Sequence, residues 1–224
     1  SDVYKRQVEG LKAPIEGEGS VSGSLQKLEL DQQVTQPVSA RLQGSVEPLG
    51  AGLPWQAVLT SEALAPNGLL EGLPELGAWA TRLEASGDLA GADLRVLELR
   101  QGERRLQGEG RIDWAGGVVL DTRLGWANLA WPLVGPAQVE SAQGQLQLSG
   151  PLTGYRLEGD ARVVVPGQPE AGIALRGTGD LAHLVFDEMT LRALEGVFEA
   201  QGELHWTPAV RWQAGFVARD LRPE

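Results

Sequence analysis

Histidines and neighbouring carboxylates are the residues of this chain with the clearest chemical potential. The two histidines are His183 and His205, and Asp187 and Glu188 lie close to the first. Imidazole and carboxylate groups are the usual acids, bases and metal ligands of proteins. A metal site needs a third ligand that converges with the other two, and the sequence indicates none. The side chains of Asp187 and Glu188, as adjacent strand residues, point to opposite faces and cannot flank one substrate. We interpret both histidines as surface groups and the carboxylate pair as part of a turn or solvated face.

Three Gly-x-Gly triplets resemble phosphate-binding loops, at residues 17–19, 108–110 and 177–179. None continues to the third glycine that must precede a helix, and the chain has neither a Gly-x-Ser-x-Gly elbow nor a Gly-Lys-Ser/Thr loop. We interpret the triplets as strand-end or bulge glycines. The sequence therefore predicts no catalytic, cofactor or metal site, and no enzyme activity.

Tryptophans form a third group of candidate functional residues. Five of the seven recur near proline or glycine at candidate strand ends: Trp114, Trp126, Trp131, Trp206 and Trp212. Aromatic rings can bind sugars, but that requires several coplanar rings on one exposed face. We expect a structural role instead, in which each ring seals the edge of a β-layer and its indole N–H finds a partner at the rim.

The elements that carry these residues are predicted to be strands. Between scattered glycines the apolar residues recur with period two, as in Leu146 and Leu148 or Ile173 and Leu175, which places them on one face of an extended chain. Turn signals such as Gly-Gly at 116–117 and Pro-Gly at 166–167 follow at hairpin intervals. The pattern predicts an all-β antiparallel meander with one apolar face.

Two local features leave alternatives open. Residues from Pro74 to Gly87 fit a short helix that begins with proline, but also a strand through Trp79, Thr81, Leu83 and Ala85; we favour the strand and leave a helical turn at 74–78 open. A glycine–strand–tryptophan pattern recurs at Gly110–Trp114 and Gly202–Trp206, with a degenerate copy from Gly44. The spacings of 66 and 92 residues are unequal, which disfavours a regular propeller or short-period solenoid.

Composition excludes several classes of protein. The 224 residues hold 19 Lys and Arg against 30 Asp and Glu, a net charge of −11, which disfavours nucleic-acid binding. The absence of cysteine excludes disulfides, thiolate catalysis and Fe–S clusters. No apolar run approaches the roughly 18 residues of a membrane-spanning helix. We expect an internal fragment, with residues 1–7 a non-native or artefactual prefix and 8–224 one continuous β-rich segment.

Specific stretches resemble a known family. The residues from Gly202 to Ala214, continuing to Asp220-Leu221-Arg222-Pro223, resemble the repeat ending of TamB proteins. The pattern recurs from Leu53 to Leu59 and ends at Leu64-Ala65-Pro66, and a second match runs from Leu124 through Trp131-Pro132-Leu133 to Tyr155. Together these stretches cover about residues 38–223.

The resemblance implies a member of the AsmA-like, bridge-type lipid-transfer group, anchored in the inner membrane and spanning the periplasm. Its strands would curl into an open trough with an apolar interior, a β-taco, that carries phospholipid acyl chains to the outer membrane. It would support outer-membrane assembly with the barrel protein TamA. We expect the membrane anchor and the TamA-contacting region to lie outside this fragment. The lipid-groove candidates are Leu146, Leu148, Val163, Val165, Ile173 and Leu175.

Two alternatives remain at this point. In the first, the apolar face packs on itself as a closed sandwich or barrel core, with no lipid involved. In the second, the chain is a structural or adhesive β-rich segment of a secreted surface protein. An uncovered apolar face distinguishes the trough from both.

Overall fold

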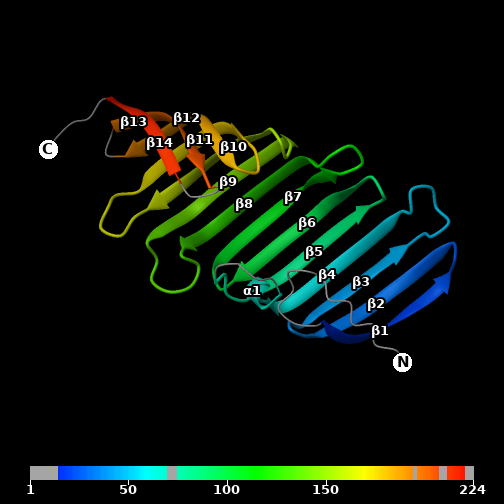
Figure 1. Cartoon of the computed structure of the whole chain (residues 1–224). Helices are drawn as coiled ribbons and strands as arrows, with labels where there is room; N and C mark the ends of the chain where they lie inside the picture. The colour runs from blue at the N-terminus through cyan, green and yellow to red at the C-terminus, as the bar shows by residue number, and fades with distance from the viewer. Residues whose placement is uncertain (1–14, 70–74, 194–195, 207–210, 220–224) are drawn as a thin grey trace.

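The computed structural model describes residues 15–69, 75–193, 196–206 and 211–219. These residues form fourteen strands in one antiparallel sheet, whose spatial order is the sequence order (Figure 1). The proposed prefix 1–7 lies outside the described residues. The strands are β1 (Glu16–Ser24), β2 (Lys27–Gln36), β3 (Ala40–Val46), β4 (Trp55–Leu64), β5 (Trp79–Gly87), β6 (Gly91–Gln101), β7 (Arg104–Asp113), β8 (Val119–Trp131), β9 (Val139–Pro151), β10 (Tyr155–Val164), β11 (Ala171–Gly179), β12 (His183–Ala193), β13 (Gly196–His205) and β14 (Arg211–Arg219).

The only described helix is α1 (Pro66–Leu69), in the connection between β4 and β5. It is too short to cross a membrane, and no other described segment is a helix that could do so. The favoured strand over Trp79–Ala85 is confirmed by β5. The described part of the helical alternative at 74–78, residues 75–78, has no helix.

The register separates an apolar face from a polar face, because directly paired residues of antiparallel strands point to the same side. One continuous row joins Leu124, Leu146, Gly159 and Leu175 across β8 to β11. The parallel row one position away joins the polar residues Arg123, Gln147, Glu158 and Arg176. The predicted one-sided meander is therefore confirmed.

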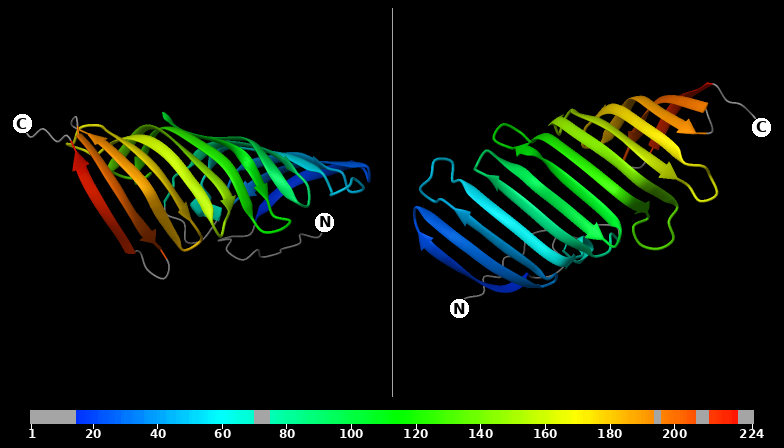
Figure 2. Two further views of the ribbon diagram at one scale, coloured as in Figure 1. Left: turned by 90° about the horizontal axis from the view of Figure 1, so that it is seen from above. Right: turned by 180° about the vertical axis from the view of Figure 1, so that it is seen from behind.

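Glycines show which face is concave. On the apolar face, a Cβ at Gly108 would lie 2.7 Å from Cδ2 of Leu124, and one at Gly177 would overlap the carbonyl oxygen of Val185. On the polar face, a Cβ at Gly172 would meet no atom within 4 Å. Bending a sheet toward one side brings the atoms on that side closer together. The crowded apolar face therefore lines the inside of the curved sheet. Figure 2 shows the resulting trough from above and from behind.

Burial shows that the trough is open. No large side chain of the described residues is fully buried, and the apolar-face leucines Leu146 and Leu175 are half-buried. A sandwich or barrel would place such leucines in a closed core. Strands β1 and β14 are the two ends of the sheet. No second layer covers the apolar face of the later strands, β8 to β14. The closed-core alternative does not describe this fold.

A four-strand unit occurs twice, which the unequal spacing of the glycine–tryptophan pattern did not predict. Strands β5 to β8 correspond to β11 to β14 with an offset of 92 residues, as from Trp79 to Ala171. The first three strands have equal lengths in both units. Both β-bulges also recur at equivalent positions, after Glu84 and Arg176 and after Leu94 and Phe186. The tetrapeptide Gly-Asp-Leu-Ala, at 87–90 and 179–182, is the sequence signal of this repeat.

Candidate functional site

Five of the six lipid-groove candidates lie together on the apolar face. Leu146 and Leu148 are on β9, Val163 is on β10, and Ile173 and Leu175 are on β11. Gly159 lies between Leu146 and Leu175, and Ala161 is paired with Ile173. The small residues of β10 leave room between the larger side chains of its neighbours. The result is an apolar strip rather than a set of separate contacts.

Val165 differs from the other five candidates. Strand β10 ends at Val164, and the Val165 carbonyl accepts a hydrogen bond from the Gln168 backbone N–H at 2.9 Å. Its side chain is 44% exposed. The Pro-Gly turn at 166–167 therefore begins one residue earlier than the alternation indicated, and Val165 lies at the rim of the trough rather than in the strip.

The strip continues onto residues that the sequence analysis missed. Phe186 pairs with Gly177, Met189 with Leu175 and Leu191 with Ile173. The β-bulge at Asp187 and Glu188 inserts an extra residue between Phe186 and Met189, so the period-two pattern breaks although all three side chains share the apolar face. No local sequence pattern marks this bulge, which is seen only in the pairing of β12 with its neighbours.

The charged side chains next to the strip on β10, β11 and β12 lie on the polar face. Arg176 donates a hydrogen bond to Glu158 at 2.9 Å and lies 3.5 Å from Glu188. These contacts, with the hydrogen bond to Glu158 foremost, raise the pKa of Arg176. Glu188 is thus half of an ion pair on the outer side of a bulge. Such exposed pairs contribute little to stability, and they keep charge off the trough lining.

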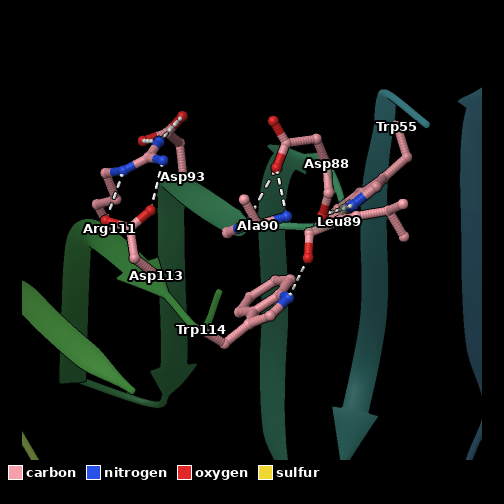
Figure 3. A network of polar contacts seen from close by, with 9 residues as sticks. Trp55, Asp88, Leu89, Ala90, Asp93, Arg111, Asp113 and Trp114 are labelled. Carbon is pink, nitrogen blue, oxygen red and sulfur yellow. Dashed lines mark hydrogen bonds and ion pairs between the residues drawn. The ribbon is translucent and has the colours of Figure 1, made fainter. Parts of the chain in front are cut away.

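Tryptophan side chains donate hydrogen bonds to the turns at one rim of the trough (Figure 3). The Trp114 indole N–H donates to the Leu89 carbonyl at 2.8 Å, and Oδ1 of Asp88 accepts the backbone N–H groups of Ala90 and Gly91 at 2.7 and 3.1 Å. The second unit repeats the arrangement with Trp206 and the Leu181 carbonyl, also at 2.8 Å. The structural role expected of Trp114 and Trp206 is confirmed. Trp126 likewise donates to Ser141 Oγ at 2.8 Å, whereas Trp131 and Trp212 are 55% and 75% exposed.

The two histidines face each other across β12 and β13. Their rings stack with centroids 5.2 Å apart, and His183 Nδ1 lies 2.9 Å from Oδ1 of Asp180. Asp180 accepts backbone hydrogen bonds from Ala182 and His183, and these lower its pKa. Within the described residues, no three or more His, Cys, Asp or Glu side chains are grouped so as to hold a metal ion. The pair lies outside the apolar strip.

Comparison with known families agrees with this geometry. Residues 117–224 match the family described as TamB, N-terminal domain. This match supports membership in the TamB family, as an internal fragment. The matched range contains β8 to β14 and all six lipid-groove candidates. Membership in the TamB family implies a protein of the Gram-negative envelope, in a family of bridge and assembly proteins. No solved structure matches the chain.

Proposed function

We propose that this TamB-family chain is a segment of an apolar trough that carries phospholipid acyl chains across the periplasm toward the outer membrane. The observation that carries the proposal is the concave apolar face, which runs across consecutive strands and stays half-exposed. A large exposed apolar surface needs a covering layer or a ligand. Acyl chains are ligands of matching shape and chemistry.

The energetics of such a surface suit transport. Burial of each methylene contributes about 0.8 kcal/mol, so a few methylenes hold a chain in the trough. Neighbouring positions along the strip offer similar side chains, so a bound chain can shift with little change in free energy. No covalent chemistry is required, which agrees with the proposal that the protein is not an enzyme.

The cellular setting follows from the family. We propose that the trough lies in the periplasm, as part of a protein anchored in the inner membrane, and that it supports outer-membrane assembly with a TamA-type barrel through a region outside this chain. A structural or adhesive role in a secreted protein is the alternative. It gains no support from an apolar face that is left open to the inside of a curved sheet.

A photo-crosslinking experiment tests the lipid proposal. A photoreactive amino acid at Leu146 or Leu175 should capture phospholipid in Gram-negative membranes, because these side chains lie on the apolar face. The matched control is Arg176, the next residue of β11, which points to the polar face. Absence of lipid at both leucines, or equal capture at Arg176, would contradict the proposal.

A further inference from the structure

The two four-strand units differ at one rim of the trough. Residues 65–78 connect β4 to the first strand of the first unit, β5, and residues 165–170 connect β10 to the first strand of the second unit, β11. The first connection therefore has fourteen residues and the second has six. The first residue of the following strand also differs, since Trp79 stands where the second unit has Ala171.

In the first unit the chain covers its own apolar face at this rim. Trp79 is 5% exposed, and its indole N–H donates to the Leu76 carbonyl of the long connection at 2.7 Å. Thr81, the next residue on the same face, is 7% exposed. Val38 and Ala40, at the adjacent end of β3, are buried as well. All of the buried hydrophobic side chains in the described residues belong to this one place.

In the second unit the same position is uncovered. Ala171 pairs with Val163, and Ile173 takes the place of Thr81. All three side chains are only half-buried, and Ile173 is more apolar than the threonine that it replaces. An indole buries about 150–250 Å² of surface, so the change from tryptophan to alanine leaves room for a sizeable apolar group.

We propose that the second unit binds a segment of lipid acyl chain in the place that Trp79 fills in the first unit. The first unit shows what kind of group this position accepts, namely an apolar one lying across the ends of the strands. Val163, Ala171, Ile173 and Leu191 form the subsite, because they are neighbours in the register of β10, β11 and β12. This inference rests on the proposed lipid function and specifies where in the trough the ligand is held.

The substitution Ala171→Trp tests the subsite by giving the second unit the side chain of the first. Lipid capture by a photoreactive residue at Val163 should fall roughly tenfold, the loss expected when about two methylenes of a bound chain leave the apolar face. Capture at Leu148, nearer the opposite rim, should persist. The matched control is Gly172→Trp, which adds the same ring on the polar face, where a Cβ has no neighbour within 4 Å.

The outcomes separate the subsite from the general proposal. Unchanged capture at Val163 in a folded Ala171→Trp variant would overturn the subsite while leaving the lipid function in place. Unfolding of that variant, seen by circular dichroism, would also overturn it, because an open position accepts an indole. Absence of lipid at both Val163 and Leu148 in the parent protein would instead contradict the lipid function itself.

Discussion

At the scale of single residues, the rim tryptophans show how a sheet without a core holds its turns. In both units an indole N–H donates to the carbonyl of an exposed leucine in a neighbouring turn, Leu89 or Leu181. An aspartate in the same turn accepts two backbone N–H groups. The polar atoms of the turn are satisfied locally, so each turn keeps its shape without burial.

Trp206→Phe tests the contribution of the indole hydrogen bond. The substitution keeps an aromatic ring but removes the N–H donor, so the free energy of unfolding should fall by about 1 kcal/mol, a typical net value for one hydrogen bond. Urea denaturation followed by circular dichroism measures it. The control is Trp131→Phe, at a ring that is 55% exposed; an equal loss there would contradict the assigned role of Trp206.

At the scale of elements, glycine placement sets the curvature of the strands. Apolar-face glycines lie where the neighbouring strand approaches most closely, as at Gly177 against Val185. Side chains with a Cβ at these positions would force adjacent strands apart on the concave side. The Gly-x-Gly triplet at 177–179, interpreted from the sequence as strand-end or bulge glycines, lies at the end of β11 and beside a bulge.

Gly177→Ala and Gly172→Ala make a matched pair on β11. The first substitution adds a methyl group against the Val185 carbonyl and should lower the free energy of unfolding by about 1–3 kcal/mol through overpacking. The second adds the same group to the polar face, where it meets nothing, and should be neutral or slightly stabilising. Thermal and urea unfolding of both variants measure the difference. Equal effects would show that the apolar face is not the crowded one.

At the scale of the whole molecule, the open sheet makes the apolar face tolerant of change where nothing covers it. Leu175 is half-buried in the open second unit, whereas Trp79 is buried and is hydrogen-bonded to Leu76 just before β5 in the first. A charge placed on an open face reaches water, but a vacancy created under a covering segment remains a cavity. Stability should therefore depend more on the covered place than on the exposed strip.

Leu175→Arg and Trp79→Ala distinguish these two environments. We expect Leu175→Arg to remain folded, with a loss of no more than about 2 kcal/mol from reduced apolar burial, and to bind less phospholipid. Trp79→Ala should cost about 3–5 kcal/mol, as for a truncated buried aromatic ring. Urea midpoints give the stabilities, and lipid extracted with the purified protein gives the binding. A globally unfolded Leu175→Arg variant would indicate a closed core instead.

Much of this architecture could be predicted from local pattern. Period-two alternation places Leu146, Leu148, Ile173 and Leu175 on one face whatever the rest of the chain does, because successive strand residues alternate sides. Glycine and proline pairs mark the hairpin turns for equally local reasons. The meander, its polar and apolar faces, and the family resemblance all follow from residues close together in the sequence.

Tertiary structure decided whatever depends on how neighbouring strands meet. The bulge before Met189 carries Phe186, Met189 and Leu191 onto one face, and only the pairing with β11 reveals it. The turn after Val164 places Val165 at the rim. Whether the apolar face was a closed core or an open trough depended on whether a second layer covers it. Alternation is the same in both cases, so this property was set by the curvature and extent of the whole sheet.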